Sequence, residues 1–206
     1  MLDHVIYGAP DLDEAVDVLE KLLGVRPSAG GHHVGLGTHN ALLDLNNDTY
    51  LEVIAPDPSQ SKPARPRAFA LDKLVRPRLI NWAAKATDLE ARVQAAKTAG
   101  FDAGPVNDMS RAKPDGDLLE WRLSQRPQGP GGDGLVPFLI DWGDAAHPAR
   151  TAAHGCTLVG WRGEHPDPVT IQHWLTALDI DLDVTQADTP ALIASIETPN
   201  GLVELR

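Results

Sequence analysis

Residues 2–24 read LDHVIYGAPDLDEAVDVLEKLLG, and this stretch decides the expected fold. Leu2–Tyr7 is rich in β-branched and aromatic residues and alternates, which is typical of a strand. After it, Asp11 is followed three residues later by Glu14, the pattern of a capping box at a helix start. Gly24 stands where a helix commonly ends. Apolar residues recur between these points at helical spacing: Val16, Leu19, Leu22 and Leu23. The stretch therefore predicts a strand followed directly by a helix.

The following residues complete one unit, and a related unit comes after it. A glycine-rich stretch over 30–37 precedes strands predicted over 38–45 and 50–55, so 1–56 reads as βαβββ when a short strand near His33 is counted. Residues 57–78 are rich in proline and predict a linker, with a short helix over 68–75.

The strand and helix signals then return, and Asp88 corresponds to Asp11 in the first unit. A second βαβββ unit is predicted over 79–148, and the pattern suggests a third, looser copy over 153–206. Repeated units with mostly short connections favour the α+β class over a doubly wound sheet.

Composition restricts the classes of function. The 206 residues carry a formal net charge of −11, which argues against nucleic acid or an anionic membrane surface as a partner. Cys156 is the single cysteine, so neither an internal disulfide nor a cysteine-rich zinc site is expected. The first residues show no signal-peptide pattern, and no apolar run approaches the ~20 residues of a membrane span. We therefore expect an acidic, soluble, cytoplasmic protein.

Three polar residues interrupt apolar strands of the first unit: His4, His39 and Glu52. Phosphate-binding loops, nucleophile elbows and His-Glu-x-x-His motifs are absent from the sequence. A polar side chain within an apolar strand is costly to bury unless it is paired or coordinated. If the three strands are neighbours, these side chains meet on the concave face of the sheet. Two imidazoles and a carboxylate suit Fe²⁺, Mn²⁺, Ni²⁺ or Zn²⁺ with open positions for water or substrate.

Each of these residues also has a purely structural interpretation. His4 fits an ordinary strand residue, His39 fits a turn, and Glu52 fits the solvent face of a one-sided sheet. Five other histidines fit solvated loops, turns or surfaces: His32, His33, His147, His165 and His173. Three arginines are candidates for an anionic substrate, although a solvated position is the default for each: Arg111, Arg122 and Arg126.

Several short segments resemble the glyoxalase-like branch of the vicinal oxygen chelate superfamily. They are Leu2–Val5, Pro10–Asp13, Leu23–Val25, Gly37–Ala41 and Tyr50–Pro56, with a weaker likeness over Pro137–Pro148. The resemblance implies paired βαβββ modules that form a curled mixed sheet around a cup. It also implies metal ligands on the first and fourth strands of each module, positions that His4 and Glu52 match in the first.

The second module departs from the family pattern. Asn81 stands where the resemblance implies a ligand, and either Ile140 or Asp141 falls at the position on the fourth strand. A four-ligand site is therefore not expected, and His39 would instead complete an unusual set of three with His4 and Glu52.

The residues and the resemblance together predict a metal-dependent lyase, isomerase or dioxygenase that acts on a small oxygenated substrate. A divalent metal would chelate two substrate oxygens, and Glu52 would also serve as the catalytic base. The alternative is a metal-free protein that sequesters a drug-like molecule in the same cup, with His39, Asn40 and Glu52 as recognition groups. Residues expected to contact the substrate are Asn40, Asn81, Trp82, Trp121, Arg122 and Asp141, with Trp142 as a further wall. The sequence leaves open whether the third copy pairs within the chain or across a homodimer.

Overall fold

A computed structural model describes residues 1–63, 66–112 and 118–206 of the chain. The first unit comprises β1 (Leu2–Gly8), α1 (Leu12–Leu23), β2 (Ser28–His33), β3 (Thr38–Asp44) and β4 (Tyr50–Pro56). The second comprises β5 (Arg78–Lys85), α2 (Leu89–Thr98), β6 (Val106–Ala112), β7 (Leu118–Ser124) and β8 (Phe138–Asp141). The third comprises β9 (Thr157–His165), α3 (Pro168–Ala177), β10 (Asp183–Gln186), β11 (Ala191–Thr198) and β12 (Gly201–Leu205). Three short 3₁₀ helices lie in the connections: η1 (Ala68–Lys73), η2 (Gly132–Gly134) and η3 (Pro148–Arg150).

Helix α1 begins and ends where its sequence predicts. The Asp11 side chain accepts a hydrogen bond from the Glu14 backbone amide at 2.9 Å, which satisfies one of the free amides of the first turn. At the other end Gly24 adopts φ 75°, a left-handed conformation that glycine enters without steric cost. Helix α2 differs, because Asp88 makes no capping hydrogen bond and its carboxylate instead accepts from the Arg92 guanidinium at 2.7 Å.

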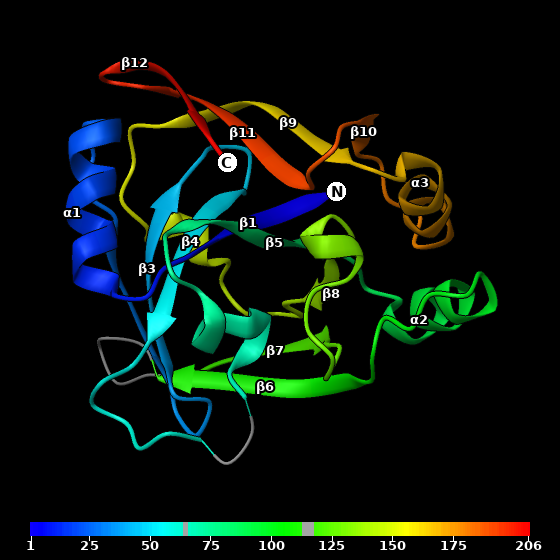
Figure 1. Ribbon diagram of the computed structural model, residues 1–206. Coiled ribbons are helices and arrows are strands. Elements are labelled where there is room, and N and C mark those ends of the chain that lie inside the picture. The colour runs from blue at the N-terminus through cyan, green and yellow to red at the C-terminus, as the bar shows by residue number, and fades with distance from the viewer. Residues whose placement is uncertain (64–65, 113–117) are drawn as a thin grey trace.

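The first two units each contribute four strands to one curled sheet that closes on itself (Figure 1). The strand order around the ring is β1-β4-β3-β2-β6-β7-β8-β5. Strands β1 and β4 pair in parallel, as do β5 and β8, and the other neighbours are antiparallel. The prediction of an α+β fold with a curled mixed sheet is therefore confirmed. Because β1 pairs with both β4 and β5, the sheet places the chain's first strand beside strands from both units.

The third unit forms a separate four-stranded sheet of order β10-β9-β11-β12. Figure 1 shows it lying across the ring, with α1 at one side and α2 and α3 at the other. It covers the outer face of the curled sheet near β5, where the Trp82 and Trp161 rings meet edge to face at 5.7 Å. The Leu79 amide also donates to the Arg206 carbonyl at 3.0 Å. The third copy therefore pairs within this chain.

The sheet has an apolar layer on each face. The outer face carries the main core, in which Val5, Leu51 and Val53 pack with α1 and with the third unit. On the inner face, Ile6 and Ile54 pack with Leu71 of η1, so the linker between the first two units fills part of the interior. Among the described residues, no helix combines the length and apolar character needed to cross a membrane.

Candidate functional site

Two polar side chains meet inside the curled sheet where β1 and β4 run parallel. His4 lies opposite Tyr50 in register and Ile6 lies opposite Glu52, which directs His4 and Glu52 to the inner face. His4 Nε2 lies 3.6 Å from Glu52 Oε2, and their side chains are 3% and 10% exposed. This separation is too long for a hydrogen bond. It is close to the roughly 3.3 Å that separates two ligand atoms bonded at about 2.0 Å to one tetrahedral ion.

Asp3 fixes the orientation of the His4 ring. A register shift between Leu2 and His4 marks a bulge in β1, and this irregularity lets the side chain of Asp3 reach the adjacent imidazole. His4 Nδ1 lies 2.6 Å from Asp3 Oδ1. The other carboxylate oxygen accepts from Trp142 Nε1 at 3.0 Å and lies 3.1 Å from His147 Nε2.

The electrostatics of Asp3 determine which nitrogen of His4 is available. Burial raises the pKa of Asp3, but the hydrogen bonds from His147 and His4 outweigh it and hold that pKa well below its usual value. The ionised carboxylate can only accept, so His4 donates from Nδ1, and Nε2 is the ring nitrogen that faces Glu52. A carboxylate behind a histidine in this way is the usual support of a metal-ligating imidazole.

The Glu52 carboxylate is held by Asn40, which lies on the neighbouring strand β3. Asn40 donates from Nδ2 to Glu52 Oε1, and its own Oδ1 accepts from the Gly31 amide at 3.0 Å. This second contact decides which end of the Asn40 amide faces Glu52. Gly30 makes the arrangement sterically possible, because a Cβ at that position would lie 2.1 Å from Asn40 Oδ1. Glu52 therefore keeps Oε2 free to face His4.

Further polar groups from β2 and β6 lie in the same interior. His33 is buried, with Nδ1 2.9 Å from Thr38 Oγ1. Burial lowers the pKa of His33, while the charges of Glu52 and Arg111 act on it in opposite directions. Arg111 is also buried and donates to the Gly30 carbonyl at 2.9 Å. The expectation that these two residues are solvated is wrong, because the strands that carry them turn both side chains inward.

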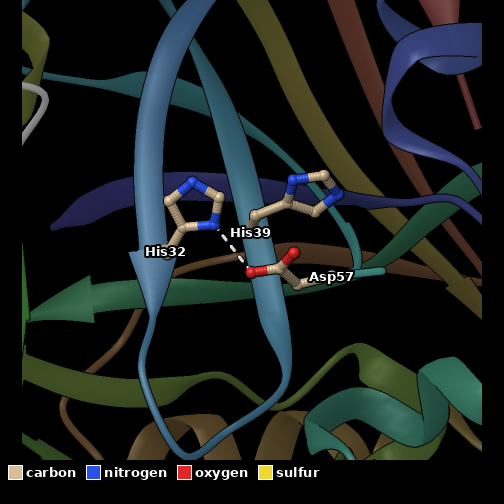
Figure 2. Close-up of side chains that lie close together, drawn as sticks. All are labelled: His32, His39 and Asp57. Carbon is tan, nitrogen blue, oxygen red and sulfur yellow. Dashed lines mark hydrogen bonds and ion pairs between the residues drawn. The ribbon is translucent and has the colours of Figure 1, made fainter. Parts of the chain in front are cut away.

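His39 lies on the opposite face of the sheet from this group. Side chains alternate along a strand, so with Asn40 directed at Glu52 the neighbouring His39 must point outward. There it stacks on His32 with ring centroids 5.9 Å apart, and Asp57 lies beside them (Figure 2). The expectation that His39 joins His4 and Glu52 on the concave face is therefore wrong.

Residues 2–178 match the family model described as glyoxalase-like domain. The chain belongs to this family. It is thereby a member of the vicinal oxygen chelate superfamily, as the sequence segments around His4 and Glu52 predicted. No curated protein matches the chain.

Solved structures are similar to the chain at low sequence identity. A hypothetical protein from Staphylococcus aureus is 19% identical with a TM-score of 0.62, covering 98% of this chain and 83% of its own. Methylmalonyl-CoA epimerase from Mycobacterium tuberculosis is 22% identical with a TM-score of 0.39, covering 68% of this chain and 84% of its own. A methylmalonyl-CoA epimerase in complex with methylmalonyl-CoA and NH4⁺ is 18% identical with a TM-score of 0.45, covering 71% and 97%. Of these three, the Staphylococcus aureus protein shows a likeness in fold alone.

Two other residues expected to contact substrate lie away from His4 and Glu52. Trp82 points to the outer face, where its Nε1 donates to the Leu135 carbonyl at 2.9 Å, so it lines no interior pocket. Arg122 forms ion pairs at the surface with Glu90 and Asp108. The structure therefore does not bring Trp82 or Arg122 to His4 and Glu52.

Asn81 is buried on the inner face of β5. It lies opposite Ile6 in register, whereas Ala83 lies opposite His4. Its Oδ1 accepts from the Trp82 amide at 2.8 Å. The second unit thus offers a neutral amide, already bonded to its own chain, at the position for which the resemblance implies a metal ligand.

A surface hollow of about 250 Å³ lies behind the His4 support. Asp141, Trp142, His147 and Lys85 are among the residues that line it, and Trp142 and His147 are the two groups that bind Asp3 from this side. The ring of Trp121 lies 5.4 Å from that of Trp142 and packs within the interior cluster. Trp121 thus packs inside the sheet, whereas Asp141 lies opposite Arg122 in register and lines the surface hollow, with the Asp3 network between that hollow and His4.

Proposed function

We propose that this glyoxalase-like protein is a metal-dependent enzyme in which His4 and Glu52 are two ligands of a divalent ion. The spacing of His4 Nε2 and Glu52 Oε2 carries the proposal, because both atoms face one point and each side chain is held from behind. Asp3 holds His4, and Asn40 holds Glu52. An imidazole nitrogen and a carboxylate oxygen suit Fe²⁺, Ni²⁺, Zn²⁺ or Mn²⁺.

The reaction class follows from what these residues can do to a small oxygenated substrate. When bound, the divalent ion would supply Lewis-acid polarisation of substrate oxygens. Glu52 would also act as the base: because Asn40 holds Oε1, Oε2 is the oxygen that would be released from the ion to take a proton from the substrate. Arg111 and His33 add a cation and a hydrogen-bonding group to the same interior, where they would orient an anionic or carbonyl-bearing substrate. A lyase or isomerase reaction that begins with proton abstraction fits these groups, and a dioxygenase is the other reaction of this proposal.

The proposal is tested by metal analysis of protein purified without an affinity tag. We expect His4→Ala and Glu52→Gln each to lose one equivalent of a divalent metal that the parent retains. His173→Ala is the matched control, because His173 is exposed on α3 and far in sequence from the site. If His4→Ala and Glu52→Gln keep the metal content of the parent, the ligand assignment is refuted.

A metal-free binding protein is the second candidate, and the position of Asn81 favours it. The neutral amide of Asn81 stands where the resemblance implies a charged or imidazole ligand, and its Oδ1 already accepts from the Trp82 amide. In that case Asn40, Glu52 and Arg111 would recognise a small molecule within the apolar interior. A ligand that raises the melting temperature equally with and without a chelator would support binding over metal-dependent catalysis.

A further inference from the structure

A second group of ligand-type side chains lies outside the His4–Glu52 site. His32 of β2 and His39 of β3 are direct partners across the hairpin, and Asp57 follows the end of β4 (Figure 2). One nitrogen or oxygen atom from each of the three lies within 4.8 Å of the others. The group is on the outer face of the sheet, whereas Asn40 and Glu52 face inward. It therefore shares no residue with the proposed catalytic centre.

Asp57 is held as a metal-binding carboxylate usually is. Its Oδ1 accepts from the Ser59 amide at 2.9 Å and from Ser59 Oγ at 2.7 Å. Its Oδ2 accepts from Gln60 Nε2 at 2.7 Å and lies 2.7 Å from His32 Nδ1. Burial raises the pKa of Asp57, but the hydrogen bonds from Gln60, Ser59 and His32 outweigh it and keep that pKa below its usual value. The carboxylate is thus ionised, fixed in direction and aimed at the histidine pair.

The position of His39 is not explained by the loop contacts alone. The hydrogen bond between His32 and Asp57 ties the hairpin to the end of β4 by itself, without any contribution from His39. Among the described residues His39 makes no side-chain hydrogen bond, yet its ring stacks on His32 at an interplanar angle of 22°. Two stacked imidazoles beside one carboxylate place three ligand atoms around one point, and a divalent cation there would compensate the buried negative charge.

We propose that His32, His39 and Asp57 form a second metal site, on the outer face of the sheet, for a divalent ion of the zinc type. Two imidazole nitrogens and a carboxylate oxygen are a frequent zinc ligand set, with a water at the fourth position. Bond lengths of about 2.0–2.2 Å require ligand atoms roughly 3.3 Å apart, so the side chains need to move by only about 1 Å. His32 has room for this, because its side chain is 59% exposed. The bound ion clamps the tip of the β2–β3 hairpin to the segment after β4.

The test is zinc titration of tag-free protein from which metals have been stripped, followed by calorimetry. We expect the parent to bind zinc at this site and His39→Phe, which keeps a ring stacked on His32, to weaken that binding by at least about 100-fold. Ser59→Ala, which removes one of the two hydrogen bonds to Asp57 Oδ1, should weaken it about 10-fold. His173→Phe is the control, because it removes an exposed histidine from α3 and should leave zinc binding unchanged.

The Glu52→Gln variant separates this site from the proposed catalytic centre. In that variant the outer site is expected to bind one zinc with the parent's affinity, and the double variant with His39→Phe is expected to bind none. Anomalous diffraction at the zinc edge should then show a peak between His32, His39 and Asp57. If His39→Phe in the Glu52→Gln background binds zinc as tightly as Glu52→Gln alone, or if Glu52→Gln binds none, the outer site is refuted. If the parent binds one zinc that His39→Phe removes and Glu52→Gln does not, the outer site stands and the interior pair is not a zinc site.

Discussion

Asp3→Asn is the substitution that tests most directly how the interior site is supported. Asp3 is fully buried, and its two oxygens lie within hydrogen-bond distance of donors on His4, His147 and Trp142. An asparagine at this position presents one oxygen and one amide, so it cannot accept from both sides and leaves at least one buried donor unsatisfied. Breaking a buried charge-assisted network of this kind costs about 3–5 kcal/mol.

Urea unfolding at pH 7 measures this cost. With an m-value near the top of the usual range, about 3 kcal/mol per M, the midpoint of Asp3→Asn should fall by roughly 1–2 M relative to the parent. Asp188→Asn is the matched control, because Asp188 is exposed and its substitution should change the free energy of unfolding by less than about 0.5 kcal/mol. The His4 ring also loses its anchor, so the metal affinity of Asp3→Asn should fall by about 10–100-fold.

The pH dependence of the difference in unfolding free energy between the parent and Asp3→Asn gives an independent check. The pKa of Asp3 is lower in the folded protein than in the unfolded chain, so its contribution is fully present above the unfolded value of about 3.9. It is lost only as the pH falls below that value, toward the folded pKa. The gap in unfolding free energy between parent and Asp3→Asn should therefore persist from pH 7 to pH 5 and close only below about pH 4. A gap of under 1 kcal/mol at pH 7, or one that vanishes by pH 5, would refute the assigned role of Asp3.

Three further substitutions separate the interior site from the surrounding structure. Gly30→Ala places a Cβ against Asn40 Oδ1. Urea unfolding should show a loss of about 1–3 kcal/mol, and the metal content should fall. Unchanged metal binding would show that the Asn40 amide does not position Glu52. Trp82→Phe leaves the Leu135 carbonyl without its donor, so unfolding should become easier by about 1–3 kcal/mol with metal and ligand binding retained; a loss of ligand binding in the folded variant would place Trp82 at the site after all. Arg122→Ala removes only exposed ion pairs, so stability and activity should stay within about 0.5 kcal/mol and twofold of the parent, and a large loss of activity would contradict its surface position.

Local signals in the chain were sufficient for the family and the fold class. The strand and helix of residues 2–24, and their return after residue 78, come from alternation, capping and helical spacing, which short segments encode by themselves. The pairing of His4 with Glu52 was also foreseeable, because each interrupts an apolar strand and each matches a ligand position of the glyoxalase-like pattern. Their roles as metal ligands stay a prediction.

The sequence alone did not show which residues of each strand face the interior. His39 and Asn40 are adjacent, and a shift of one residue exchanges which of them faces Glu52. The register of β3 against β4, with Asn40 opposite Ile54, settles this in favour of Asn40. The same reasoning separates Trp82 on the outer face from Ala83 on the inner face. Arg122 lies on the outer face because the neighbouring Trp121 faces inward, and it forms ion pairs there with Glu90 on α2 and Asp108 on β6.

By itself the sequence determined the order of strands and helices, the family, and two of the polar residues that enter the interior. Only the tertiary structure decided that the third unit covers the outside of the ring, that Asp3 supports His4, and that His39 joins His32 and Asp57. The physical reason is range: propensity and capping act over a few residues, whereas these contacts depend on strand register and on bulges. Register is set by the packing on both faces of the closed sheet. The first two units supply the strands of that sheet, and the third unit packs on its outer face.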